Sequence, residues 1–196
     1  MSKAIYVLVV EGFADWEPAH ALAELRRQGQ FRVETVGLTL RPVQSMGGLT
    51  ILPSKAVAEV DISDVAAFIV PGGDRWEKAA VEPELETLLR QLDAAAIPIA
   101  AICAATVAIA RLGLLRGRQH TSNGLSYLLS HVPTYSESHA YVDAPAVRDR
   151  RLITASGLGN VEFARELFEE LDVLGPDVRE LWARVFRDGK LPTDAH

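Results

Sequence analysis

The stretch that decides the fold is Ile-Pro-Ile-Ala-Ala-Ile-Cys-Ala-Ala-Thr-Val-Ala-Ile-Ala-Arg-Leu-Gly, residues 97–113. Its first part, Ile97–Ile102, is a short apolar run typical of a strand buried in a parallel sheet. Its second part, residues 104–112, is typical of a helix, which Gly113 closes. The pattern therefore places Cys103, the only cysteine of the chain, at a turn where a strand runs directly into a helix.

This position favours a reactive cysteine for two reasons. A sharp strand-to-helix turn around a nucleophile needs small neighbours, and Ala101 and Ala105 flank Cys103 at two residues on either side. A thiol at a helix N-terminus also faces unpaired N–H groups and the positive end of the helix dipole, which favour the nucleophilic thiolate. A buried structural cysteine fits the local sequence equally well, because free cysteine is among the most buried residue types.

The first half of the chain alternates predicted strands and helices. Strands are expected at residues 4–10, 31–38 and 67–70, with a helix at about 14–28 and one or two helices through Leu92. A hairpin at residues 40–52, with Met46-Gly47-Gly48 as its turn, interrupts this alternation. The β-α-β succession favours a mostly parallel sheet and hence an α/β fold of the doubly wound type, with helices on both faces.

The second half continues the same pattern with weaker signals. Residues 134–139 and 147–155 fit strands, with a turn near residues 148–151. A helix follows Gly157-Leu158-Gly159-Asn160 through Leu174, and Pro176 begins the last helix. The apolar stripe of that helix, expected in the core or at an oligomer contact, consists of Val178, Leu181, Trp182, Val185 and Phe186. Residues 1–196 are predicted to form one domain.

Length and composition limit the classes of function. The 196 residues carry a formal net charge of −6 and no basic block, which argues against a nucleic-acid partner. The single cysteine rules out an internal disulfide and fits a reducing cytoplasm. The N-terminal apolar run is too short, and too soon followed by Glu11, for a signal peptide or a membrane span. No Cys/His cluster with metal-ligand spacing occurs, so we expect no metal.

Three features lie at predicted strand ends or in the turns that follow them, where ligands gather in a doubly wound sheet: the segment 11–17, Gly72-Gly73 and Cys103. A carboxyl group of Glu17 pointed at the Cys103 sulfur would carry protons or hydrogen-bond an oxidised sulfur, and burial beside a thiolate would raise its pKa. The simpler interpretation makes Glu17 an ordinary acid in the first turns of a helix. Asp15 and Glu11 compete for the same role.

The glycine pair and one histidine complete the candidate site. Gly72 allows close backbone approach, and the N–H groups of Gly73 and Ala104 would form an oxyanion hole, although a Gly-Gly pair is also a common tight turn. His120 lies in a polar stretch a few residues beyond the Cys103 helix and is a candidate base or orienting group. A lone histidine is more often a surface or satisfied core residue.

In combination these segments resemble the ThiJ/PfpI superfamily, which includes the Parkinson-disease-associated deglycase. The residues that carry the resemblance, in order, are Asp15-Trp16-Glu17, Val70-Pro71-Gly72-Gly73, Ala100-Ala101-Ile102-Cys103-Ala104, His120, Tyr135-Ser136-Glu137 and Leu152–Gly157. The similarity covers nearly the whole chain and implies a flavodoxin-like, class I glutamine-amidotransferase-like fold. The segments Cys-Ala-Ala-Thr and His-Thr-Ser-Asn look most like the bacterial YdeA/YoaZ-type branch.

The resemblance implies a role for each candidate. Cys103 becomes the nucleophile, Glu17 its protonated carboxyl partner, Gly73 and Ala104 the oxyanion donors, and His120 the nearby histidine. The protease branch has histidine directly after the cysteine, where this chain has Ala104, so a protease-type pair is not expected. The late His-x-Glu pair of glutaminases is absent from the sequence, and the isonitrile (isocyanide) hydratase branch differs at the positions of Glu17 and Ala104.

Three functions remain open at this point. The first is a cofactor-free enzyme in which Cys103 attacks a small reactive carbonyl compound such as methylglyoxal, or a hydrolase using the same covalent chemistry. The second is a stress-response protein in which Cys103 is oxidised to a sulfinic acid that Glu17 stabilises. The third is a chaperone, which would need an exposed apolar patch. The resemblance also implies a homodimer, and neither a membrane nor nucleic acid is an expected partner.

Overall fold

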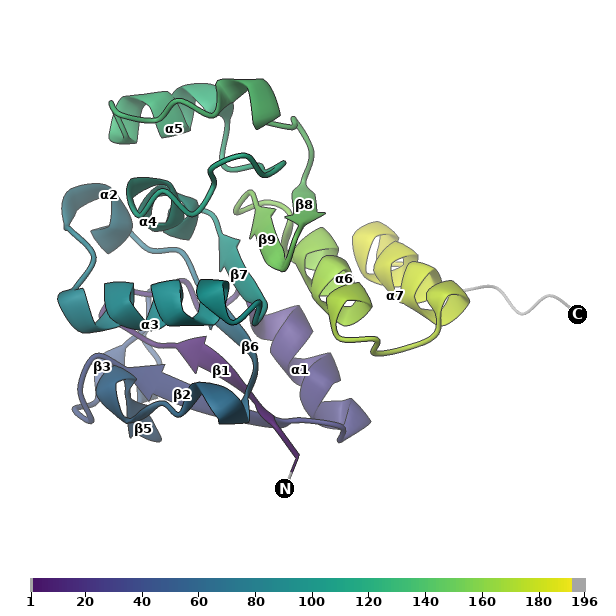
Figure 1. Cartoon of the computed structure of the whole chain (residues 1–196). Helices are drawn as coiled ribbons and strands as arrows, with labels where there is room; N and C mark the ends of the chain where they lie inside the picture. The colour runs from purple at the N-terminus through teal and green to yellow at the C-terminus, as the bar shows by residue number, and fades with distance from the viewer. Residues whose placement is uncertain (1, 192–196) are drawn as a thin grey trace, which may run out of the picture.

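The computed structural model describes residues 2–191 and contains a seven-stranded sheet (Figure 1). The strands follow the order β5-β2-β1-β6-β7-β9-β8, and every neighbouring pair is parallel except β8 and β9. Their bounds are β1 Ala4–Leu8, β2 Arg32–Gly37, β5 Lys55–Ala56, β6 Val65–Val70, β7 Ile99–Ile102, β8 Ala146–Asp149 and β9 Leu152–Ala155. The expected doubly wound α/β fold is confirmed.

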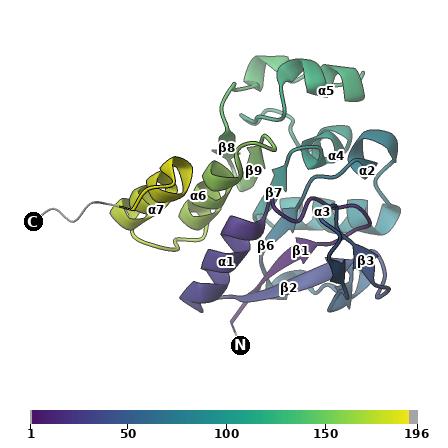
Figure 2. The same cartoon turned by 180° about the vertical axis from the view of Figure 1, so that it is seen from behind.

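Helices cover both faces of this sheet. On one face lie α1 (Ala19–Gln28), α6 (Asn160–Glu170) and α7 (Pro176–Asp188), which Figure 2 shows side by side. On the other face lie α3 (Pro83–Ala94) and α4 (Ala105–Arg111). Alternate side chains of each strand therefore enter two different cores, which explains why the central strands are apolar without interruption.

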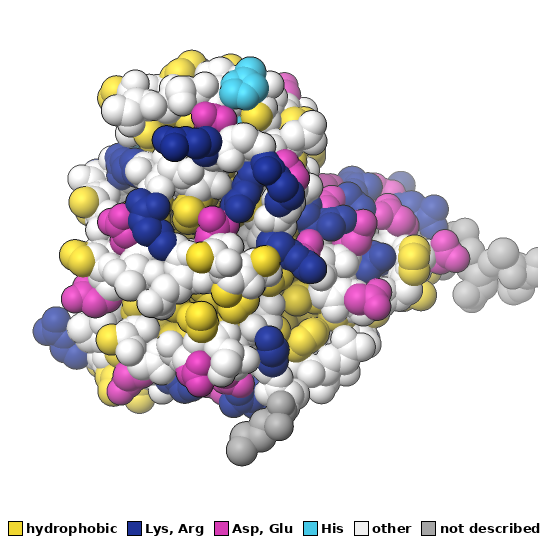
Figure 3. Space-filling view, in the orientation of Figure 1, with side chains coloured by type: hydrophobic (Ala, Val, Ile, Leu, Met, Phe, Trp, Pro, Cys, Tyr) yellow, Lys and Arg dark blue, Asp and Glu magenta, His cyan; other side chains and the backbone are white. Residues whose placement is uncertain are grey.

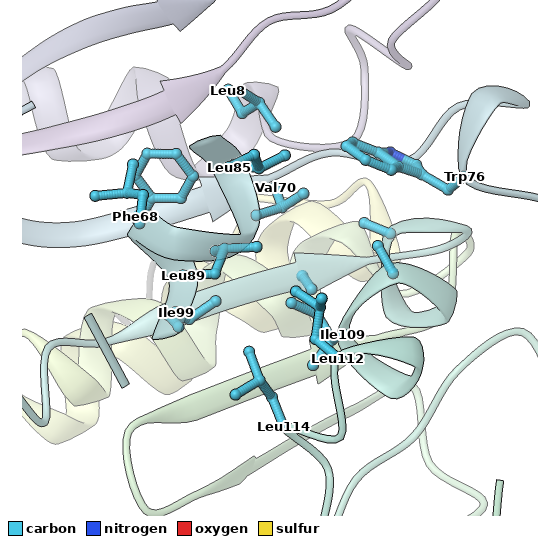
Figure 4. Close-up of a cluster of buried hydrophobic side chains, with 14 of the residues drawn as sticks. Leu8, Phe68, Val70, Trp76, Leu85, Leu89, Ile99, Ile109, Leu112 and Leu114 are labelled. Atoms are coloured by element: carbon cyan, nitrogen blue, oxygen red, sulfur yellow. The ribbon is translucent and has the colours of Figure 1, made fainter. Parts of the chain in front are cut away.

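The core between the sheet and α3 is closely packed (Figure 4). Leu8, Phe68, Val70 and Ile99 point from the strands toward Leu85 and Leu89 of α3, with Ile109 and Leu112 beside them. On the outer surface of the same side, basic and acidic side chains are interspersed and hydrophobic side chains gather across the middle (Figure 3). No helix within residues 2–191 is long and apolar enough to cross a bilayer.

One arginine joins the short helices beside the site. Arg111, the last residue of α4, donates to the carbonyl oxygens of Trp76 and Glu77 in α2 (Arg75–Lys78), at 2.6 and 3.0 Å. It also donates to Ala79 at 2.9 Å and, in α5 (Leu125–His131), to His131 at 3.2 Å. The single guanidinium thus ties α2, α4 and α5 together at the carboxyl end of β7.

The expected hairpins are present. Strands β3 (Val43–Gln44) and β4 (Thr50–Ile51) pair antiparallel around the predicted glycine turn. Strands β8 and β9 pair in the same way, and Arg150 and Arg151 between them adopt positive φ angles of 46° and 66°. Of the apolar stripe on α7, Trp182 is buried, whereas Val178, Leu181 and Phe186 are exposed.

Three predicted elements differ from the structure. Helix α1 begins at Ala19 and not near residue 14. Pro18 directly precedes it, and a proline disfavours helical geometry in the residue before it, here Glu17. Residues 134–139 form no strand; a 3₁₀ turn covers Ser138–Ala140, and the Glu137 carboxylate accepts from the Gly117 N–H at 2.8 Å. Helix α6 ends at Glu170 and not at Leu174, because Asp172 turns into positive φ, 52°.

Replacing Arg111 tests its structural role. We expect Arg111→Gln to lower the free energy of unfolding by about 2 kcal/mol, because four carbonyl oxygens lose a charged donor. Urea denaturation measures the loss, with the exposed Arg116→Gln as the matched control. Equal stability of the two variants would contradict the role of Arg111.

Candidate active site

Cys103 occupies a strained turn between β7 and α4. Its φ angle is +59°, a region that residues with a side chain rarely adopt. The backbone N–H donates to the carbonyl oxygen of Ala155 at 2.9 Å, which fixes the turn to the end of β9. Ala101 and Ala105 are fully buried. The predicted turn from strand to helix at Cys103 is therefore confirmed.

Two glycines leave the space in which the cysteine side chain sits. A methyl group on Gly72 would lie 2.8 Å from the Cβ of Cys103, and one on Gly157 would lie 2.9 Å from its Sγ. Any larger residue at either position would displace the sulfur. Gly72 was expected at the site, whereas Gly157 was not. Its signal in the sequence is a glycine two residues after the last residue of β9.

Glu17 lies in the turn before α1 with its carboxyl group against the cysteine. The residue is 1% exposed, and its Oε2 accepts from the Gly72 N–H at 2.6 Å. The Cys103 side chain lies against the same carboxyl group, whose Oε1 is buried and has no hydrogen-bond partner among residues 2–191. Burial raises the pKa of Glu17 to about 7, and the Gly72 N–H and the Cys103 side chain oppose that rise.

The two competing acids have other partners. Glu11 accepts from the backbone N–H of Gln44 at 3.1 Å. Asp15 accepts from the Ser45 hydroxyl at 2.6 Å. Both therefore hold the β3–β4 hairpin, and Glu17 is the one of the three that faces the sulfur.

The ionisation of Cys103 differs from the expectation. Burial raises the pKa of the thiol to about 11, and the negative charge on Glu17 adds to the rise. The expected preference for thiolate was wrong in direction, because burial and the negative charge on Glu17 outweigh the donors that favour the charged sulfur. At neutral pH the resting sulfur is a thiol beside a carboxyl group that titrates near 7.

Asn123 is a site residue that the sequence analysis missed. Its Nδ2 donates to the Cys103 Sγ at 3.3 Å, and its Oδ1 accepts from the Gly157 N–H at 2.9 Å. The donor lowers the pKa of the thiol and so favours the thiolate when it forms. The signal in the sequence was weak, since Asn123 is one polar residue in a polar loop.

His120 lies close by in sequence but does not point to the sulfur. The ring is fully buried, with Nδ1 2.7 Å from the Arg118 carbonyl oxygen and Nε2 2.5 Å from the Tyr135 hydroxyl. Because a carbonyl oxygen only accepts, Nδ1 carries the proton and Nε2 accepts from Tyr135. Burial lowers the pKa of His120, which keeps the ring neutral. Both ring nitrogens are thus engaged away from Cys103.

Of the two expected oxyanion donors, Ala104 directly follows the cysteine in the chain, and Gly73 follows Gly72, whose backbone lies against the Cys103 side chain. Gly73 has a φ angle of +146°, and a methyl group there would lie 2.7 Å from the Gly12 carbonyl oxygen, so this turn requires glycine. The Ala104 N–H hydrogen-bonds the cysteine sulfur and lowers the pKa of the thiol. Whether both N–H groups bind an oxyanion stays a prediction.

A cleft opens beside these residues. It has a volume of about 640 Å³ and is lined by Ser122, Asn123, Gly124, Ser156, Leu158, Glu162 and Arg187, among others. Asn123 and the loop around Gly157 separate it from the sulfur. The volume suits a small molecule. Among residues 2–191, no three His, Cys, Asp or Glu side chains are grouped as metal ligands would be.

The raised pKa of Glu17 predicts a dependence of stability on pH. Between its ordinary value of 4.5 and about 7 the folded protein binds a proton that the unfolded chain does not, so stability falls as the pH rises through this window. Glu17→Gln has no such proton and should gain stability relative to wild type, by at most about 3 kcal/mol at pH 8. Urea denaturation of both proteins from pH 4.5 to 8 measures the difference; parallel profiles would refute the raised pKa.

Comparison with known proteins agrees with this geometry. The sequence profile described as the DJ-1/PfpI family matches residues 3–170. The "Uncharacterized protease YoaZ" of Bacillus subtilis is 34% identical over 96% of this chain and 93% of its own. The "Deglycase TK1284" of Thermococcus kodakarensis is 25% identical over 60% of this chain and 70% of its own.

A solved structure extends the likeness to the whole fold. The DJ-1 superfamily protein Atu0886 from Agrobacterium tumefaciens superposes with a TM-score of 0.87 at 31% identity, covering 97% of this chain and all of that one. The profile match spans most of the chain and includes Glu17, Cys103 and the loop of Asn123. The chain belongs to the DJ-1/PfpI family.

Proposed function

We propose that the chain is an enzyme that converts small reactive dicarbonyl compounds to hydroxy acids through Cys103. The observation that carries the proposal is the pair formed by buried Glu17 and half-buried Cys103, in which one carboxyl oxygen is held by Gly72 and the carboxyl group faces the thiol. A carboxyl group with a pKa near 7 both accepts and returns a proton at neutral pH. The relative named deglycase is consistent with chemistry on carbonyl compounds.

The first step of the proposed reaction joins the sulfur to the aldehyde carbon. The thiol proton moves to the Glu17 carboxylate as the Cys103 sulfur attacks, so that a thiolate need not exist at rest. The N–H groups of Gly73 and Ala104 stabilise the negative charge on the aldehyde oxygen, and Glu17 then returns its proton to that oxygen. The product is a hemithioacetal, and the Glu17 carboxylate is regenerated.

The later steps move one proton between neighbouring carbons. The Glu17 carboxylate removes the hydrogen of the former aldehyde carbon as a proton, and the bonding electrons form an enediolate with the adjacent carbonyl. Return of that proton to the adjacent carbon, together with transfer of the hydroxyl proton from the former aldehyde oxygen to the enediolate oxygen, gives a hydroxy thioester. One carbon is thereby oxidised and its neighbour is reduced. One water molecule then cleaves the thioester to the hydroxy acid and restores the Cys103 thiol. The balance needs no outside oxidant or reductant.

Proteolysis is a weaker proposal for this chain, although one relative is named a protease. A cysteine protease needs a histidine within reach of the sulfur. Ala104 follows the cysteine directly, and the ring nitrogens of His120 bond to Arg118 and Tyr135.

Oxidation of Cys103 is the second candidate function, and the donors around the sulfur favour it. The Asn123 Nδ2 and the Ala104 N–H already face the sulfur, and a protonated Glu17 adds a third donor for a sulfinate oxygen. Two molecules of hydrogen peroxide would convert the thiol to the sulfinic acid and release two molecules of water. This reaction uses the same geometry without turnover.

Turnover of methylglyoxal to lactate tests the enzyme proposal. We expect Cys103→Ala to abolish it and Glu17→Gln to lower kcat by about 10²–10⁴-fold, because the proton carrier is lost. Asp15→Asn is the matched control. Asp15 lies two residues before Glu17 in the chain, but its carboxylate accepts from the Ser45 hydroxyl. The variant should therefore retain most of the activity. Lactate formation is followed enzymatically.

Intact mass after peroxide treatment of the same proteins separates the two candidates. Wild-type turnover that disappears in Cys103→Ala supports the enzyme. A stable adduct of two oxygen atoms that requires Glu17, in a protein without turnover, would overturn the enzyme proposal in favour of the oxidation sensor.

A further inference from the structure

The cleft beside the site carries charged side chains that do not cancel. Glu162 of α6 and Arg187 of α7 both line the cleft, and the Arg187 Nε donates to the Glu162 Oε1 at 2.7 Å. Among residues 2–191, Arg187 is the one basic side chain in the lining, and this bond engages it. Asp143, in the loop before β8, lines the same cleft, is exposed and takes part in no ion pair within that range. Two acids against one base leave the cleft with a net negative charge.

This cleft lies next to the reacting atoms. Asn123 lines it, and the Asn123 Nδ2 is 3.3 Å from the Cys103 Sγ. Gly157 stands in the chain between two residues that also line the cleft. A methyl group on Gly157 would lie 2.9 Å from the Cys103 Sγ and 3.5 Å from the Glu17 Oε1. One asparagine side chain and one glycine backbone therefore lie between the charges of the cleft and the pair of Glu17 and Cys103.

The Glu17 carboxyl group gives a second, independent indication of which ligands the site accepts. Glu17 is 1% exposed, and its Oε1 is buried without a hydrogen-bond partner among residues 2–191. A buried acceptor that stays unpaired is costly, so this oxygen requires a donor from outside the protein. In its ionised form, with which the proposed reaction starts, the oxygen accepts a hydrogen bond or a proton and repels another carboxylate.

The substrate and the product of the proposed reaction differ in charge. A dicarbonyl compound such as methylglyoxal is neutral, whereas the hydroxy acid formed from it is an anion at neutral pH, because carboxylic acids ionise near pH 4. A site with a net negative charge therefore admits the substrate and repels the product. The charges that leave entry unhindered thus favour release of the acid.

We propose that the cleft selects ligands by charge, so that neutral and cationic carbonyl compounds reach Cys103 and anionic ones, including the hydroxy acid product, are disfavoured. Asp143 supplies the unpaired negative charge and is the specificity-determining residue. Arg187 limits the contribution of Glu162 by pairing with it. Oxo acids, which carry a carboxylate beside the carbonyl group, are accordingly poor substrates. The inference rests on the proposed function for its carbonyl substrates, whereas the charge of the cleft does not depend on it.

The rates at which a cationic and an anionic methanethiosulfonate modify Cys103 test this proposal. The chain has one cysteine, so the trimethylammonioethyl and the sulfonatoethyl reagents both report on this sulfur alone. Each rate is divided by the rate of the same reagent with 2-mercaptoethanol, which removes the intrinsic difference between the reagents. Both react with the thiolate, so the pKa of Cys103 cancels in their ratio. We expect a corrected ratio of cationic to anionic rate of about 10 at low salt, which falls toward 1 as salt screens the charges.

Two substitutions in the cleft should change this ratio in opposite directions. Asp143→Asn should lower it about threefold, because the unpaired negative charge is lost. Arg187→Gln should raise it, because Glu162 loses the base that pairs with it. Asp177→Asn is the matched control: it removes the same charge from an exposed position in the first turn of α7, at the other end of that helix from Arg187, and should leave the ratio unchanged. Thermal unfolding confirms that each variant is folded.

Two results would overturn the proposal. One is a wild-type ratio at or below 1, which would make Arg187 the dominant charge and the cleft a site for anions. The other is a folded Asp143→Asn protein with the wild-type ratio. Neither measurement involves turnover, so a high ratio without methylglyoxal conversion would refute the proposed enzyme alone, and a low ratio with full conversion would refute the charge selection alone.

Discussion

The burial of one carboxyl group against one sulfur is the constraint on which the rest of the site depends. Glu17 and Cys103 come from opposite ends of the first hundred residues and meet because β1 and β7 flank β6 in the sheet. The contact is possible only where Gly72 and Gly157 carry no side chain. Burial makes the carboxyl a weak acid and keeps the sulfur protonated at rest, which gives the pair one mobile proton near neutral pH.

Much of the fold follows from local sequence, and part of the site does. The run at residues 97–113 predicts the turn that carries Cys103, because apolar strand, small residues and helix stop agree with one another. Local sequence does not predict which of Glu11, Asp15 and Glu17 faces the sulfur. The first two bind the hairpin at residues 43–51, and this contact leaves Glu17 for the site. The place of Asn123 in the site likewise follows from a tertiary contact, its hydrogen bond to Cys103. The pKa of Cys103 depends on burial, which no local sequence pattern reveals.

The chemistry available to the pair fits more than one of the activities for which related chains are named. In the proposed function Cys103 is the nucleophile and Glu17 the proton carrier, and the same two roles would serve addition to a carbonyl, hydrolysis and oxidation alike. Three features surround the pair: an amide at Asn123, a cleft of about 640 Å³ next to it, and a His120 ring bonded to Arg118 and Tyr135. These features favour small ligands and disfavour a protease-type Cys-His pair.

The protonation of Glu17 is the property to measure first, by following its side-chain carboxyl carbon with NMR across pH in protein made with ¹³C-labelled glutamate. The Glu17→Gln spectrum assigns the resonance. We expect a midpoint near 7 in wild type, and a higher midpoint in Cys103→Ala, because the thiol hydrogen bond that lowers the pKa is removed. A midpoint near the ordinary value of 4.5, unchanged by loss of the sulfur, would contradict the buried proton-sharing pair.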